Sequence, residues 1–96
     1  IVTNKSLRLL CKCQSILELI QRNNNRIAAK KADLNVYRNC KDPFAVTRLM
    51  NNESDYLRWI ERWQQLDAWL IVRYQSAMIE LNLETTKQLE RVLQTA

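Results

Sequence analysis

The stretch RNCKDPF, residues 38–44, decides the fold of this 96-residue chain. Asp42 can cap a helix that begins at Pro43, where the missing N–H of proline costs no hydrogen bond. The residue before a proline is disfavoured in helical conformation, so a preceding helix should end by about Cys40. The stretch therefore predicts a helix over about 5–39, a turn at 40–42 and a second helix from 43 to about 93, within a single domain over 1–96.

The composition excludes a sheet protein. The chain has no glycine and one proline, while 47% of its residues are hydrophobic and 26% are charged. Tight hairpin turns between strands depend on residues with positive φ, which glycine supplies most readily. The balance of apolar and charged residues is that of a folded domain. Long helices with few turns are the expected architecture.

The first helix carries apolar residues at heptad spacing, at Cys13, Ile20, Ile27 and Leu34. This spacing predicts coiled-coil-like packing against one antiparallel neighbour. Asn23 and Asn24 interrupt the apolar stripe. We expect a solvated edge at this point, and the alternative is a polar contact that sets the register of the two helices.

The second helix is longer than the first. At about 1.5 Å per residue the two would measure roughly 75 Å and 50 Å. The second helix therefore either projects beyond the first or breaks, and the candidate breaks are 51–55 and 82–86, where asparagine, serine or threonine can cap a new helix. The fold class is all-α, as an antiparallel helical hairpin or a three-helix bundle.

The stretch DYLRWIERWQQLDAWLIV, residues 55–72, contains all three tryptophans of the chain. On a helical wheel its apolar arc spans roughly 240°, and one packing surface needs about 100° or more. The first helix can cover only one side, so a third segment of the chain, a second copy or another protein must cover the rest. We expect a protein partner or a homo-oligomer to bind through Tyr56, Leu57, Trp59, Ile60, Trp63, Leu66, Trp69 and Leu70.

Positive charge is concentrated in the first helix. Residues 1–41 hold nine Lys/Arg and two acidic residues (+7), and residues 42–96 hold six and eight (−2). Six of these cations fall within an arc of roughly 100° on the wheel, away from the apolar stripe. Such a ridge can attract an acidic protein or, alternatively, nucleic acid, although no aromatic residue interleaves with it in sequence. The basic ridge consists of Lys5, Arg8, Lys12, Arg22, Arg26 and Lys30.

The residues needed for common catalysis are missing. There is no histidine to act as acid, base or zinc ligand, and no glycine for a phosphate-binding loop. Cys11 and Cys13 point to different faces of a helix, which favours core cysteines over a metal site. Asp67, within the apolar stripe, is expected to pair with Arg22 or Arg26 of the facing helix or to lie at a wet edge. We expect no enzyme activity, catalytic residue, cofactor, metal or small-molecule substrate.

Two features bear on the setting of the protein. Three cysteines are an odd number without a disulfide pattern, which favours a reducing, cytoplasmic location. No run of about 18 apolar residues is present, so we expect no membrane span.

Short motifs in both helices resemble a known family. CQSIL (13–17), DYLRWIERW (55–63) and the polar turn between the helices are similar to stretches of the FliJ-like stalk proteins of type III secretion. The resemblance implies an antiparallel helical hairpin whose partners are the secretion ATPase and the export gate. The sequence as a whole predicts a non-enzymatic helical interaction module that serves as a subunit, adaptor or chaperone of a larger assembly.

Overall fold

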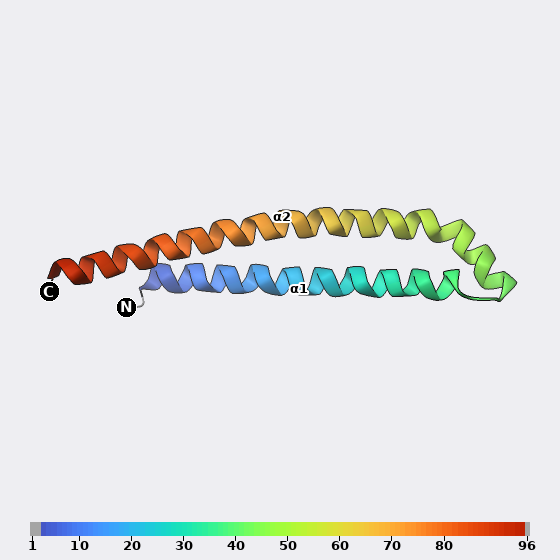
Figure 1. Ribbon diagram of the computed structural model, residues 1–96, viewed down its shortest axis with the longest axis horizontal. Coiled ribbons are helices and arrows are strands. Elements are labelled where there is room, and N and C mark those ends of the chain that lie inside the picture. Colours follow the sequence, from blue (N-terminus) through green and yellow to red (C-terminus); the bar gives the residue numbers. More distant parts are fainter. Residues whose placement is uncertain (1–2, 96) are drawn as a thin grey trace. The chain divides into compact units, whose positions relative to one another are not determined.

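A computed structural model describes residues 3–95, and the side chains of these residues apart from 45–46 and 49–51. The described part contains two helices, α1 (Asn4–Arg38) and α2 (Pro43–Thr95), joined by a short turn (Figure 1). The two helices pack antiparallel as a hairpin. The all-α prediction is therefore confirmed, and of the two predicted arrangements the structure has the hairpin.

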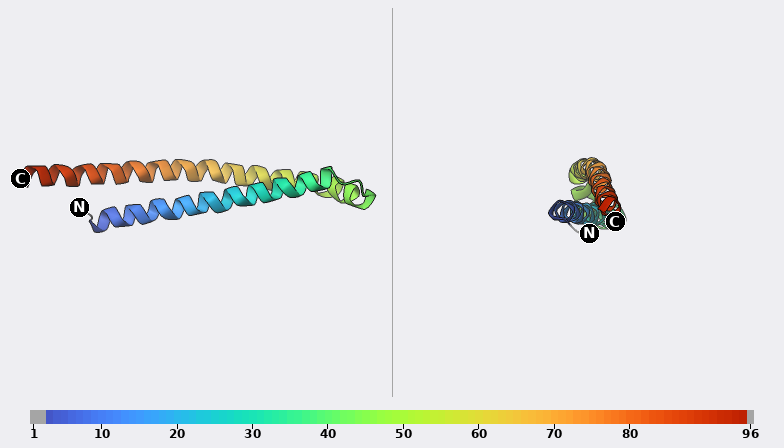
Figure 2. Two further views of the ribbon diagram at one scale, coloured as in Figure 1. Left: turned by 60° about the horizontal axis from the view of Figure 1, so that its bottom comes forward. Right: turned by 90° about the vertical axis from the view of Figure 1, so that its left-hand side faces the viewer.

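The turn between the helices is capped as the sequence predicts. The backbone amide of Phe44 donates to Asp42 Oδ1 at 3.1 Å, and Pro43 is the first helical residue. At the end of α1, the amide of Cys40 donates to the carbonyl of Tyr37 at 3.2 Å. None of the described residues has a positive φ, so the chain completes this turn, green in Figures 1 and 2, without glycine.

α2 remains helical through both candidate breaks, 51–55 and 82–86. In both ranges, polar side chains bond back to the carbonyl four residues earlier in the same helix. Asn52 Nδ2 donates to the carbonyl of Arg48, and Thr85 Oγ1 donates to the carbonyl of Leu81, both at 2.9 Å. Groups bonded in this way do not cap a new helix. These two candidate caps therefore bond within α2 and do not begin a new helix.

Apart from the half-buried Leu17, Asn52 and Met78, the buried and half-buried residues repeat at alternating intervals of three and four along each helix, which is the a/d pattern of a coiled coil. We call these residues the seam. The predicted heptad positions belong to it, with Cys13 and Leu34 only 4% exposed. In α1 the seam consists of Ser6, Leu9, Cys13, Ile16, Ile20, Asn23, Ile27, Lys30, Leu34 and Tyr37, and in α2 of Glu53, Tyr56, Ile60, Trp63, Asp67, Leu70, Tyr74, Ala77, Leu81, Glu84 and Gln88.

The contacts within the chain form two compact units. Unit 1 comprises Ile1–Ile20 and Trp69–Ala96, and unit 2 comprises Gln21–Ala68. Each unit is an antiparallel pair of helical segments, one from α1 and one from α2. Unit 2 also contains the turn, where Arg38 Nε donates to Glu53 Oε1 at 3.1 Å and links the end of α1 to α2.

Neither α1 nor α2 offers, within the described residues, a stretch that is apolar and long enough to cross a membrane.

Candidate functional site

The tryptophan-containing segment divides into a covered set and an exposed set. Tyr56, Ile60 and Trp63 in unit 2, and Leu70 in unit 1, lie on the seam and face α1. Ile60 and Leu70 are only 6% and 5% exposed, so they do not contribute to the outer surface. The hairpin therefore covers about half of the wide apolar arc. The exposed residues are Leu57, Trp59, Leu66 and Trp69, at 41–56% exposure.

In unit 2, two tryptophans and two arginines form one cluster. The rings of Trp59 and Trp63 lie 5.9 Å apart between centroids. The guanidinium of Arg26, from α1, lies 5.5 Å from the Trp63 ring centroid, and that of Arg62 lies 5.5 Å from the Trp59 centroid. These are cation–π distances. We call Arg26, Trp59, Arg62 and Trp63 the Trp–Arg cluster.

Asn23 holds the cluster in place from the seam. Asn23 is only 5% exposed, and its Nδ2 donates to the backbone carbonyl of Trp63 at 2.7 Å. The other polar atom of the side chain, Oδ1, is buried and has no hydrogen-bond partner among the residues that the structure describes. The prediction of a solvated edge is therefore wrong for Asn23. Asn23 instead makes the polar contact between the helices that was the alternative interpretation. This contact ties Trp63 to one position opposite α1.

Asp67 lies half-buried on the seam of unit 2, but its partner is not an arginine. Among the described residues it forms no ion pair with Arg22 or Arg26, so the expected pairing is wrong. The Asn24 side chain faces both carboxylate oxygens of Asp67, and we assign its nitrogen to that side because only a donor is compatible with two acceptors. In this orientation it donates to Oδ1 at 3.1 Å and to Oδ2 at 3.3 Å.

Half of the predicted basic ridge contacts α2, so the expectation that the ridge lies away from the helix contact is wrong for these residues. Arg26 lies over Trp63, and Lys30 Nζ lies 4.7 Å from the Tyr56 ring centroid. Lys5 Nζ lies 3.5 Å from Glu84 Oε2. Long basic side chains can place their alkyl part beside an apolar seam and their charge at its edge. The other members, Arg8, Lys12 and Arg22, are exposed.

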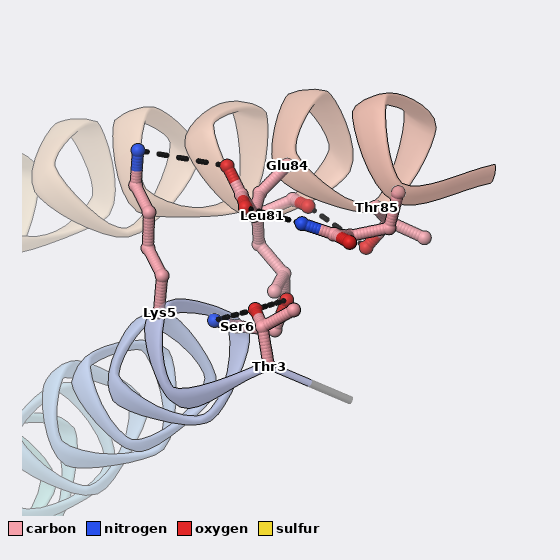
Figure 3. Close-up of polar contacts among 7 residues, drawn as sticks. Thr3, Lys5, Ser6, Leu81, Glu84 and Thr85 are labelled. Carbon is pink, nitrogen blue, oxygen red and sulfur yellow. Dashed lines mark hydrogen bonds and ion pairs between the residues drawn. The ribbon is translucent and has the colours of Figure 1, made fainter. Parts of the chain in front are cut away.

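Glu84 is a buried acidic residue on the seam of unit 1 (Figure 3). Gln88 Nε2 donates to Glu84 Oε1 at 3.0 Å, and Lys5 pairs with the other carboxylate oxygen. The hydrogen bond from Gln88 and the positive charge of Lys5 together lower the pKa of Glu84 from its ordinary value, against the opposing effect of burial. The group is therefore held as a carboxylate.

Unit 1 contains an apolar groove that the sequence did not indicate. Its volume is about 220 Å³. The groove is lined by Leu10, Cys13, Gln14 and Leu17 of α1 and by Tyr74, Met78 and Leu81 of α2.

The three cysteines are free. Cys13 is buried at this groove, Cys11 is exposed and Cys40 is half-buried. The expectation of a core cysteine therefore holds for Cys13 and is wrong for Cys11.

The third tryptophan, Trp69, belongs to unit 1 and is 56% exposed. The guanidinium of Arg73, one turn further along α2, lies 5.2 Å from its ring centroid. This local pair has the same cation–π character as the contacts in the Trp–Arg cluster. Arginine beside tryptophan is thus a repeated feature of α2.

Comparison of the chain with protein-family models, curated proteins and solved structures gives no match. The class that the fold defines is that of antiparallel helical hairpins, and the resemblance to FliJ-like stalk proteins stays a prediction.

Proposed function

We propose that this chain is a non-enzymatic helical interaction module that binds an acidic protein segment at the Trp–Arg cluster of unit 2. The observation that carries the proposal is the exposure of Trp59, which is 48% exposed although its neighbour Trp63 is packed on the seam. Tryptophan and arginine are the residues most enriched where protein interfaces bind tightly.

The exposed apolar residues of unit 2 share one flank of α2. Trp59 and Leu66 are seven residues apart with Arg62 between them, so all three lie along the same side of the helix. Leu66 is 41% exposed. A helix laid along this flank would place apolar side chains at helical spacing on Trp59 and Leu66.

The charge beside this flank defines the partner. Arg26 and Arg62 are both exposed, and Arg26 reaches the cluster from α1. A partner helix with aspartate or glutamate next to its apolar residues would pair with these two guanidiniums. Complementary charge of this kind sets specificity and the rate of association. An amphipathic acidic helix is therefore the proposed partner.

Selection from an unbiased library of helical peptides tests this proposal. Peptides enriched on the wild-type chain should carry acidic and large apolar residues on one face, and Trp59→Ala or Arg62→Glu should weaken their binding at least tenfold. Arg48→Glu is the matched control, because Arg48 is also an exposed arginine of α2 in unit 2 but lies far along the helix from the cluster. Enrichment of basic peptides, or equal binding to all variants, would contradict the proposal.

Nucleic acid is the second candidate ligand, and one observation favours it. The hairpin brings Trp63 beside Arg26 and Tyr56 beside Lys30, so aromatic residues do accompany the basic ridge in unit 2. Stacking side chains next to cations are typical of single-strand binding. It ranks second because these aromatic rings already contact cations of the chain. Salt-dependent retention on a polyanion that Arg22→Glu and Arg26→Glu abolish would favour nucleic acid.

We propose a reducing, cytoplasmic setting, as the odd number of free cysteines suggests. The resemblance of CQSIL and DYLRWIERW to the FliJ-like stalk proteins supports a secretion assembly as one such setting, with the secretion ATPase and export gate as partners.

A further inference from the structure

We infer that unit 1 carries a separate surface for self-association, on which a second copy of the chain packs. The inference does not depend on the Trp–Arg cluster, which belongs to unit 2. It starts from the distribution of charge along α2 within unit 1. All charged residues of 69–95 stand at heptad positions c, d and g, counted from the seam: Arg73, Glu80, Glu84, Lys87, Glu90 and Arg91.

The remaining outward positions of this segment, b, e and f, contain no charge. Several of their residues are strongly exposed: Val72 is 59% exposed and Ile79 is 60% exposed. A solvated helix face normally carries charged residues, and exposed apolar residues without charges among them mark an interaction surface. The exposed apolar residues at these positions form two groups, within 71–79 and within 89–93, separated by the uncharged polar Asn82, Thr85 and Thr86. We call these positions the uncharged face: Ile71, Val72, Gln75, Met78, Ile79, Asn82, Thr85, Thr86, Leu89, Val92 and Leu93.

The groove of unit 1 adjoins the uncharged face. Met78 belongs to both, and α1 contributes Leu10 and Leu17 to the opposite wall of the groove. A volume of about 220 Å³ is below the roughly 300–1,000 Å³ of typical small-molecule sites. A groove of this size between two helices suits side chains inserted from a third helix, as knobs enter holes in a coiled coil.

A second copy is the occupant that the surface of unit 1 favours. Residues 69–95 carry three cations and three acidic residues, so this segment has no net charge to oppose self-association, although the chain as a whole carries +5. The uncharged face presents an exposed ridge, Val72 and Ile79, next to a groove in the same unit. A two-fold arrangement can place the ridge of each copy in the groove of the other, which closes the assembly at a dimer.

The molar mass of the full chain across a dilution series tests this inference, with a reducing agent present because the Cys11 thiol is exposed. The wild type should approach 22.8 kDa, twice 11.4 kDa, at high concentration and dissociate on dilution. Ile79→Lys should weaken the dimer at least tenfold, because it places a charge on the ridge. Glu80→Lys, at an exposed and already charged position of the same helix, should leave it unchanged.

Three results would overturn the inference: a monomer at every concentration up to about 1 mM, a dimer that Ile79→Lys leaves intact, or a dimer that Glu80→Lys weakens equally. Circular dichroism of each variant separates loss of the dimer from loss of the helices. Trp59→Ala should not change the molar mass. If Trp59→Ala abolished the dimer, self-association would belong to the Trp–Arg cluster, whereas loss of peptide binding alone would concern only the proposed function.

Discussion

Unit 1 and unit 2 are built on the same alternation of three and four residues, but they differ in what stands beside the seam of α2. In unit 2 the exposed flank combines Trp59 and Leu66 with Arg62, and Arg26 of α1 joins it. In unit 1 the exposed Val72 and Ile79 lie on a face without charge. The former suits a ligand with negative charge, and the latter suits an apolar surface.

In both units, the seam residues and the exposed flank residues of α2 have separate roles. The seam residues hold two helices together in both units, because their burial is the main favourable term for packing. The flank residues contribute less to the hairpin, since they are about half exposed, and they are therefore free to specify a partner. A substitution on the seam should change stability first, and a substitution on a flank should change association first.

The largest expected effect is a loss of folding stability on substitution of a seam residue. Ile60→Ala in unit 2 and Leu70→Ala in unit 1 each remove a buried side chain, and each should lower the free energy of unfolding by about 2–5 kcal/mol. Leu57→Ala is the control, because Leu57 lies in the same segment but is 46% exposed, and it should cost under about 1 kcal/mol. Urea unfolding followed by circular dichroism measures all three. Equal losses would show that the flank also belongs to the core.

A smaller change in stability is expected for substitutions of Asn23 in unit 2. Asn23→Ala removes the hydrogen bond to the Trp63 carbonyl and should cost about 0.5–1.5 kcal/mol. Asn23→Leu should instead equal or exceed the wild type in stability, because it replaces the unpartnered Oδ1 with an apolar group on the seam. The same variant should broaden or multiply the indole N–H resonances of the NMR spectrum, since register is less restricted. A single sharp set in Asn23→Leu would show that Asn23 has no part in register.

The smallest expected effect concerns the seam of unit 1 and appears with pH. The folded-state pKa of Glu84 is lowered below its ordinary value of 4.5, first by the hydrogen bond from Gln88 and then by Lys5. Folding therefore favours the carboxylate, and this contribution is present above pH 4.5 and is lost as pH falls through the lower folded-state pKa. Glu84→Gln should show a shallower loss of stability below pH 4.5 than the wild type, measured by thermal unfolding. An unchanged or steeper pH dependence would contradict this assignment.

The helices and their caps could be predicted because their signals are local. Asp42 and Pro43 act on the residues next to them. The heptad spacing of Cys13 and Leu34 identifies a buried stripe on α1 however α1 is aligned with α2. The candidate breaks were less predictable. Asn52 and Thr85 can cap a helix or bond back to it, and the choice depends on whether neighbouring turns are packed against another helix.

The surfaces were only partly predictable. The wide apolar arc correctly indicated that one helix could not cover the whole tryptophan segment, but the covered half depends on how α1 is aligned with α2. The uncharged face left a signal in the sequence, the absence of charge at b, e and f over 71–93, which becomes visible once the seam defines the heptad positions.

The sequence by itself determined that this chain forms two long helices with a capped turn and a repeating apolar stripe, because these features depend on neighbouring residues and on one helical period. Only the tertiary structure decided that Asn23 is buried against Trp63, that Arg26 belongs with the tryptophans, and that Leu10 and Met78 line one groove. The physical reason is that each of these contacts joins residues far apart in the chain, and their alignment follows from the packing of the whole seam.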